Sequence, residues 1–187
     1  LARIHSKGIV YCDISPNNVF YSDTDNFSNV WLIDCDNLKF IGDVKKGIFT
    51  PGYGAPEVVA NLTSNTIFSD CFSFAVLAFK VLTNRNPFEE NYESIESDSD
   101  GWDASTTEPA SISSNKLSWL FENGTTDELR DYFRHFIDHE LLDLFDKTFN
   151  SKGRLEPTSR PSMRMWYEAL KVTITRINKC DSGEYVY

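Results

Sequence analysis

The sequence predicts a mainly α-helical domain with a small β component, of the α+β class, in which helices surround one buried central helix. Residues 71–79 are apolar on nearly every side, as expected for a helix in the middle of a protein. Large apolar residues recur at three- and four-residue intervals between 129 and 145, which is typical of amphipathic helix. Short runs of β-branched and aromatic residues favour strands. These runs are residues 9–11, 19–21, 30–33 and 38–41.

The N-terminal part is expected to alternate short elements with turns. Residues 1–7 have the character of the last turns of a helix, and Gly8 would end it, because glycine adopts the backbone conformation that commonly follows a helix. The strand at 30–33 is expected to pair with the strand at 19–21, with a polar turn at 22–26 between them. This pairing would bring Asp34, which follows the second strand, to the neighbourhood of Asn18, which precedes the first.

The central helix is expected to begin at Asp70, since aspartate is a favoured helix N-cap, and to close at residues 84–88. Residues 89–114 are acidic, rich in serine and threonine and poor in large apolar residues, so we expect a surface insertion without regular structure. Eight acids and no lysine or arginine lie between residues 89 and 108. The net charge is −10, so the rest of the chain carries a charge near −2.

The C-terminal part is expected to be helical. The amphipathic pattern between 129 and 145 predicts helix in two pieces. Pro161 is expected in the first turn of a last helix, where its missing N–H costs nothing. The inward-facing residues of that helix are predicted to be Trp166, Ala169, Leu170, Thr173 and Ile177. We assign residues 1–178 to one domain and residues 179–187 to a C-terminal tail.

Composition excludes several classes of protein. Hydrophobic residues make up 41% of the 187 residues, which suits one globular domain with a core. No apolar run approaches the roughly 18 residues of a membrane helix, and residues 1–7 lack the apolar core of a signal peptide. The four cysteines have no metal-ligand spacing, so we expect reduced thiols and a cytoplasmic location. The negative net charge argues against a nucleic-acid partner.

One stretch carries candidate chemistry. Asp13 precedes Asn18 by five residues, and Pro16 stiffens the turn between them. A carboxylate on such a loop can accept a proton or orient a hydroxyl, and an amide oxygen can bind a hard cation. By itself the pattern is more often an ordinary polar turn.

The order of further motifs distinguishes the two interpretations. Asp13 and Asn18 have the spacing of the catalytic Asp and the metal-binding Asn in the protein kinase catalytic loop, which this stretch resembles. Four later segments resemble, in the same order, the metal-binding Asp-Phe-Gly motif, the Ala-Pro-Glu end of the activation segment, the start of the central helix and a late arginine. These are residues 34–36, 50–57, 70–74 and 160–162. The resemblance extends to about residue 170.

The resemblance implies the large, mainly helical lobe of a bacterial-like Ser/Thr protein kinase, with short hairpins at the catalytic cleft. Asp13 would be the catalytic residue, and Asn18 and Asp34 would bind Mg²⁺ and thereby ATP. A protein would be the substrate that receives the phosphate. In the family, the equivalent of Asp70 accepts hydrogen bonds from the catalytic-loop backbone. The equivalents of Glu57 and Arg160 form a buried ion pair.

Departures from the family pattern keep a second interpretation open. Tyr11 and Cys12 replace the histidine and arginine of the catalytic loop, and Ser15 stands where Ser/Thr kinases usually carry a lysine. Cys35-Asp36 replaces Phe-Gly. These changes favour a pseudokinase, a binding or scaffolding module of the same fold, whereas the intact acids and amide favour an enzyme. A third alternative, a small-molecule phosphotransferase, disagrees with the Ala-Pro-Glu match.

Two further expectations follow from the resemblance. The glycine-rich loop, the ATP-binding lysine and its glutamate partner are absent from the sequence, so we expect a separate ATP-binding lobe upstream of Leu1, without which the chain is inactive. Residues 35–49 contain no Ser, Thr or Tyr, and Cys12 cannot bind a phosphate as arginine does. Activation by phosphorylation of this segment is therefore not expected. Thr50 is predicted to contact the catalytic loop.

Overall fold

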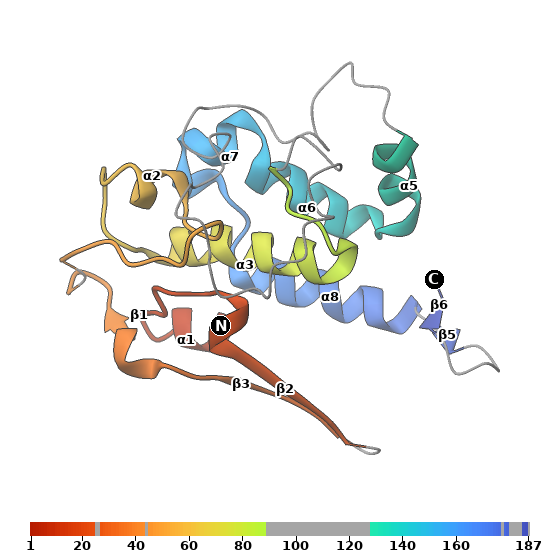
Figure 1. Ribbon diagram of the computed structural model, residues 1–187, viewed down its shortest axis with the longest axis horizontal. Helices are drawn as coiled ribbons and strands as arrows, with labels where there is room; N and C mark the ends of the chain where they lie inside the picture. Colours follow the sequence, from red (N-terminus) through yellow and green to blue (C-terminus); the bar gives the residue numbers. More distant parts are fainter. Residues whose placement is uncertain (25–26, 44, 89–127, 177, 180–184, 187) are drawn as a thin grey trace, which may run out of the picture.

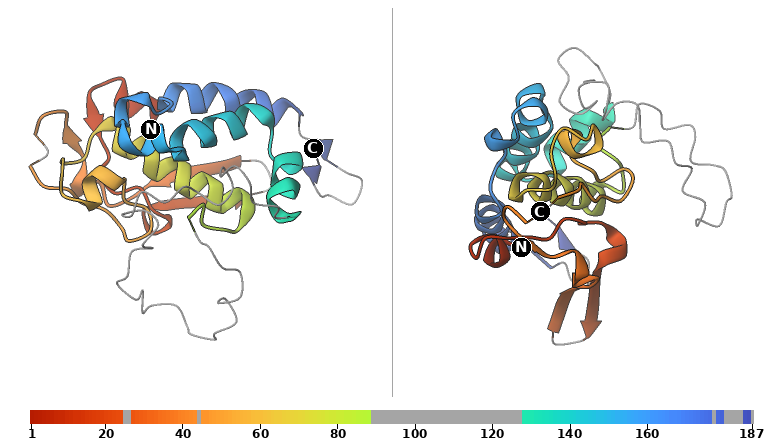
Figure 2. Two further views of the ribbon diagram at one scale, coloured as in Figure 1. Left: turned by 90° about the horizontal axis from the view of Figure 1, so that it is seen from above. Right: turned by 90° about the vertical axis from the view of Figure 1, so that its left-hand side faces the viewer.

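The computed structural model describes residues 1–24, 27–43, 45–88, 128–176, 178–179 and 185–186. Helices form one body, and a long β-hairpin projects from it (Figures 1 and 2). The strands of the described residues pair only in antiparallel twos, β1 with β4, β2 with β3 and β5 with β6. The mainly helical architecture with a small β component is as predicted.

The helices and strands are short except for α3 and α8. The helices are α1 (Ala2–His5), α2 (Pro56–Val59), α3 (Ile67–Thr83), α5 (Glu128–Phe136), α6 (His139–Phe149), α7 (Ser151–Leu155) and α8 (Met163–Arg176). The described residues also form the 3₁₀ turns η1 (Pro16–Asn18), η2 (Cys35–Asn37) and η4 (Pro157–Ser159). The strands are β1 (Ile9–Val10), β2 (Val19–Thr24), β3 (Phe27–Leu32), β4 (Lys39–Phe40), β5 (Asn178–Lys179) and β6 (Tyr185–Val186).

Helix α3 is the central helix that the sequence predicted. Phe72, Ala75, Val76 and Phe79 on α3 are fully buried, which explains why this segment is apolar on nearly every side. Helices α6 and α8 run along α3 in Figure 1 and contribute aromatic rings to the same core. The Phe79 ring packs edge-to-face with that of Phe145 at a centroid distance of 5.3 Å. Such aromatic pairs add specific geometry to the burial of apolar area.

Two predicted helix starts are wrong. Helix α3 begins after Thr66, whose side chain accepts hydrogen bonds from Phe68 and Ser69 N–H in a capping box, and not at Asp70. Helix α8 begins at Met163, two residues after Pro161. There the Ser162 hydroxyl accepts a hydrogen bond from the N–H of Met165, a capping contact that proline cannot provide. In both cases a hydroxyl residue at the actual start was overlooked.

The hairpin of β2 and β3 is longer than predicted. Val19 pairs with Leu32 at its base, which confirms the predicted pairing of 19–21 with 30–33. The register continues to Thr24, which pairs with Phe27, so residues 22–24 belong to the strand and not to a polar turn. Polar residues are tolerated there because the hairpin projects into solvent, as the right-hand view of Figure 2 shows.

The remaining predictions have mixed outcomes. Helices α5 and α6 are the predicted two pieces, and Asp138 between them accepts a hydrogen bond from the N–H of Glu140 to cap α6. Trp166, Ala169 and Thr173 of α8 are buried as expected. Ile177 and the predicted insertion at 89–114 lie outside the described residues. No helix within the described ranges is long and apolar enough to span a membrane.

Candidate functional site

The loop between β1 and β2 carries Asp13 in a fixed orientation. The side-chain amide of Asn18 donates to the Asp13 backbone carbonyl at 2.9 Å and to its Oδ2 at 3.0 Å. The hydroxyl of Thr50 donates to the other carboxylate oxygen, Oδ1, at 2.7 Å. The predicted contact of Thr50 with this loop is therefore confirmed. Asp13 remains partly exposed, so its carboxylate is held in place and still open to a substrate.

Asn18 and Asp34 lie at the base of the β2–β3 hairpin. The N–H of Ile33 donates to the Asn18 carbonyl at 3.0 Å, so the residue after Ile33 is held beside Asn18. Asp34 is exposed and has a φ of 54°, a left-handed conformation that turns the chain sharply out of β3. The amide nitrogen of Asn18 is used by Asp13, which leaves its amide oxygen as the atom available to a cation.

Tyr11 ties the loop to the hairpin. Its buried side chain donates its hydroxyl hydrogen to the carbonyl of Ile33, and the carbonyl of Asn18 is 3.3 Å away. Burial, and then the nearby Cys35, Asp34 and Asp13, raise the pKa of Tyr11 to about 12. The phenol therefore stays protonated and remains a hydrogen-bond donor. The replacement of histidine by tyrosine at this position keeps the loop anchored.

Asp70 anchors the backbone just before Asp13. Its carboxylate, 1% exposed, accepts hydrogen bonds from the N–H of Tyr11 at 2.7 Å and of Cys12 at 3.0 Å. The Nε2 atom of His5 lies 3.0 Å from the same carboxylate. Cys12 has a φ of 77°, which is unfavourable for a residue with a side chain and is maintained only when surrounding contacts enforce it. The predicted contact of Asp70 with the loop backbone is confirmed.

A buried ion pair fixes the end of the segment that contains Thr50. The Arg160 guanidinium contacts both carboxylate oxygens of Glu57, at 2.8 and 2.7 Å. It also donates to the Gly153 carbonyl at 2.6 Å and lies over the Phe72 ring at 5.0 Å. The Arg160 side chain is fully buried and that of Glu57 is 9% exposed. The predicted pair is present, and it joins α2 to the helical core.

The comparison with known families agrees with this arrangement. The family model described as "Protein kinase domain" matches residues 1–169. The chain belongs to the protein kinase family.

Similar kinases come from animals and bacteria. The chain is 31% identical over 173 residues to human protein kinase C delta type, a match that covers 88% of this chain and 24% of that protein. Rat serine/threonine-protein kinase D2 is 35% identical over 94 residues, covering 49% of this chain and 11% of that protein. Serine/threonine-protein kinase pkn2 of Myxococcus xanthus is 34% identical over 97 residues, covering 48% and 12%. The chain thus spans at most about a quarter of these relatives.

Ser15 is the departure from the kinase pattern with the clearest structural consequence. Its side chain is fully buried, and its hydroxyl has no hydrogen-bond partner among the described residues. Ser/Thr kinases usually carry a lysine at this position, whereas Ser15 offers no positive charge to a phosphate. The loop retains its acid and amide and lacks this one positive charge.

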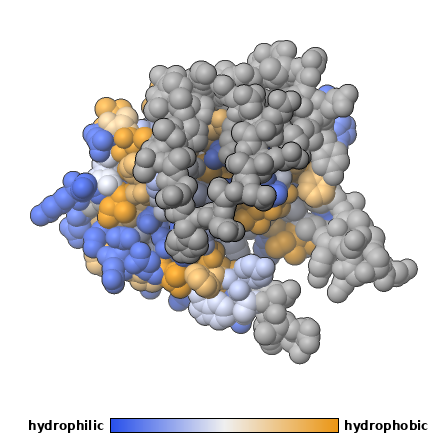
Figure 3. Space-filling view, viewed as in Figure 1, coloured by the Kyte–Doolittle hydropathy of each residue, from blue (hydrophilic) through white to orange (hydrophobic). Residues whose placement is uncertain are grey.

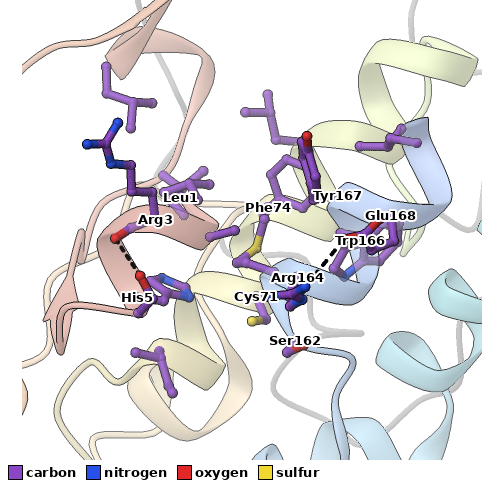
Figure 4. A pocket seen from close by; sticks show the side chains of 18 of the residues that line it. Leu1, Arg3, His5, Cys71, Phe74, Ser162, Arg164, Trp166, Tyr167 and Glu168 are labelled. Atoms are coloured by element: carbon purple, nitrogen blue, oxygen red, sulfur yellow. Dashed lines mark hydrogen bonds and ion pairs between the residues drawn. The ribbon is translucent and has the colours of Figure 1, made fainter. Parts of the chain in front are cut away.

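A separate cavity of about 930 Å³ lies between α1, α3, α8 and the hairpin (Figure 4). Leu1, Phe74 and Trp166 are among its mainly apolar lining residues. Neither Asp13, Asn18 nor Asp34 lines it. The cavity is therefore distinct from the candidate active site.

Sequence reasoning missed the roles of Asn65 and His5. Asn65 is 6% exposed and hydrogen-bonds to the backbone of both Cys12 and Ile48. No motif pointed to it, because an asparagine between α2 and α3 reads as an ordinary turn residue. No motif singles out His5 either. Its partner, Asp70, is 65 residues away and only the fold brings them together.

The thiols of the site should differ sharply in reactivity. Burial raises the pKa of Cys12 and of Cys71 to about 12, above the ordinary value of 9.0, whereas Cys35 is exposed. Because the thiolate is the reactive form, a maleimide near neutral pH should label Cys35 rapidly and leave Cys12 and Cys71 unmodified. Peptide mapping by mass spectrometry measures this. Fast labelling of Cys12 in the folded protein would contradict the packing described, while labelling in denaturant is the positive control.

Proposed function

We propose that this chain is the catalytic lobe of a Ser/Thr protein kinase, which transfers the γ-phosphate of ATP to hydroxyl groups of proteins. The observation that carries the proposal is the Asp13 carboxylate, held between the Asn18 amide and the Thr50 hydroxyl and partly open to solvent. A carboxylate in this position orients the substrate hydroxyl and accepts its proton. Phosphoryl transfer depends on such positioning more than on covalent chemistry.

Asn18 and Asp34 fit the requirements of Mg²⁺. One amide oxygen and one carboxylate are hard oxygen ligands, and Mg²⁺ typically takes only one or two protein carboxylates together with phosphate oxygens and water. The absence of any group of three His, Cys, Asp or Glu side chains among the described residues is compatible with this mode. Bound Mg²⁺ would neutralise charge on the phosphates of ATP. Asn18 and Asp34 would hold it beside Asp13.

The preference for serine and threonine on a protein substrate rests on the relatives. Rat kinase D2 and bacterial pkn2 are named serine/threonine-protein kinases. The Thr50-to-Glu57 segment, fixed at one end by Asp13 and at the other by Arg160, supports a protein rather than a small molecule as the substrate. The reduced thiols of Cys12, Cys35 and Cys71 support a cytoplasmic location.

A separate ATP-binding lobe completes the site in this proposal. Support comes from large apolar side chains that are exposed on the β2–β3 hairpin, just after it and at β4, a surface of the kind that marks an interaction site. These are Phe20, Tyr21, Val30, Trp31, Ile33, Phe40 and Ile41. Hydrophobic residues also reach the surface on the face shown in Figure 3. Such a lobe would supply the phosphate-binding lysine that this chain lacks.

The 187-residue chain alone should bind Mg²⁺-ATP weakly and transfer no phosphate. It supplies only one face of the nucleotide site, so most of the contacts with adenine and the phosphates are missing. Isothermal titration calorimetry should give a Kd well above the micromolar range. A micromolar Kd would overturn the two-lobe proposal. Phosphate transfer to a generic protein substrate is then measured with the two-lobed protein, in which an ATP-binding lobe precedes this chain. Transfer is expected there.

The buried Ser15 favours a second candidate, a pseudokinase that binds partners without catalysis. No cation stands at this position, and its hydroxyl is directed into the protein. The transfer assay distinguishes the two candidates. A two-lobed protein that binds Mg²⁺-ATP and transfers no phosphate would be a pseudokinase.

A further inference from the structure

We propose that Asn65 is a positioning residue that locks the segment before Thr50 onto the catalytic loop without any phosphate. The proposal rests on the proposed kinase function for its catalytic consequence. The lock itself is a structural property of this chain and can be measured independently.

The Asn65 side chain makes three short hydrogen bonds to two distant segments. Its Oδ1 accepts from the N–H of Ile48 at 2.7 Å, and its Nδ2 donates to the Ile48 carbonyl at 2.8 Å. The same Nδ2 donates to the carbonyl of Cys12 at 2.8 Å. Asn65 therefore satisfies both polar backbone groups of Ile48, as a neighbouring strand would, and joins them to the catalytic loop.

Both residues that Asn65 contacts are close to Asp13. Cys12 directly precedes Asp13, and its two polar backbone groups are held by buried side chains, the N–H by Asp70 and the carbonyl by Asn65. Ile48 lies two residues before Thr50, which donates to the Asp13 carboxylate. Asn65 thus fixes the backbone on both sides of the Asp13–Thr50 hydrogen bond.

The segment packs closely at the point where Asn65 holds it. A Cβ added at Gly47 would lie 2.7 Å from Cγ1 of Val58, closer than real contacts allow. The chain before Ile48 therefore packs directly against Val58 of α2. Displacing Ile48 would break the Asn65 contacts and move Thr50 together with it.

The hydrogen bonds of Asn65 join the two segments through uncharged groups, whereas a phosphate on such a loop would join them by pairing with a positive charge. A phosphate orders a loop by pairing with arginine, but the residue before Asp13 is Cys12, and residues 35–49 offer no hydroxyl to modify. Asn65 connects the catalytic loop and the segment before Thr50 by bonding to the backbone of Cys12 and Ile48. These backbone groups do not depend on the side chains at the two positions. The lock consequently needs no modifying enzyme.

The first test measures the lock directly in this chain by amide hydrogen exchange. In Asn65→Ala the Ile48 N–H loses its acceptor, and its exchange should be about ten times faster or more, while amides in the middle of α3 change much less. Unchanged exchange at Ile48, or equal acceleration in Ile48 and α3, would overturn the proposal. The result does not depend on catalysis.

The second test uses phosphate transfer by the two-lobed protein. Asn65→Ala should lower kcat about tenfold or more and leave the KM for ATP unchanged. In a Thr50→Val background the same substitution should lower kcat by less than about threefold, because the Asp13–Thr50 contact is already lost. Equal losses in both backgrounds would show that Asn65 is merely structural. If Asn65→Ala does not fold, Asn65→Ser replaces it, since serine is small, polar and neutral but has no amide group to bond both Ile48 and Cys12.

Asn150→Ala is the matched control. Asn150 also bonds to a backbone group, accepting from the N–H of Gly153 at 2.9 Å, but it caps α7. Loss of this cap should lower stability without lowering kcat, and a comparable loss of kcat would overturn the specific role of Asn65.

Phosphatase treatment of the wild type should leave kcat unchanged, and a large loss of kcat would contradict a lock that needs no phosphate. If the wild type transfers no phosphate, the proposed function fails and the exchange experiment still decides the lock.

Discussion

Asp13→Asn is expected to lower kcat for phosphate transfer by about 10²–10⁴-fold in the two-lobed protein, with little change in ATP affinity. The amide oxygen can still accept the hydrogen bond from the Thr50 hydroxyl, and Asn18 can still donate to the backbone carbonyl of residue 13, whereas the hydrogen bond from Asn18 to Oδ2 is lost. What it loses is the negative charge and the ability to take a proton from the substrate hydroxyl. Steady-state transfer to a protein substrate, with ATP titrated separately, measures both parameters.

Two further variants sharpen this test. Asp34→Asn should weaken Mg²⁺-dependent nucleotide binding as well as transfer, because Asp34 is proposed as a metal ligand. Asp36→Asn is the control, since Asp36 is an exposed acid two residues further on with no proposed role. Transfer by Asp13→Asn at the wild-type rate would refute the assignment of Asp13 as the catalytic residue.

Arg160→Met is expected to lower the free energy of unfolding by about 3–5 kcal/mol. The Glu57 carboxylate, only 9% exposed, would lose both guanidinium contacts and remain as an unpaired buried charge. The carbonyl of Gly153 would lose its donor too. Equilibrium unfolding in urea, followed by circular dichroism, measures the difference.

A second substitution and an exposed pair serve as controls. Combining Arg160→Met with Glu57→Gln should cost less than the sum of the single changes, because the unpaired charge is removed. Lys147→Met breaks an exposed pair with Asp143 at 2.5 Å and should cost less than about 1 kcal/mol. Similar costs for the exposed and the buried pair would contradict the proposed contribution of Arg160.

The local pattern of the sequence was enough to predict much of the fold. An apolar run without a polar side specified α3, since a helix can satisfy its backbone internally and bury every face. The spacing of apolar residues specified α5 and α6 in the same way. The starts of α3 and α8 were misplaced, because several residues near each start could cap a helix and packing selects among them.

The sequence by itself also determined which residues are candidates for the chemistry, because Asp13, Asn18 and Asp34 occur in recognisable short motifs. The contacts that orient them were decided by the tertiary structure. Asp70 meets Cys12 across 58 residues, Asn65 meets Cys12 across 53, and Arg160 meets Glu57 across 103. A short motif fixes residue types and spacing along the chain, whereas a hydrogen bond needs two atoms within about 3 Å in space. Tertiary packing brings these distant atoms together, of α3 and Asn65 against the loop in the first two cases and of α2 against the helical core in the third.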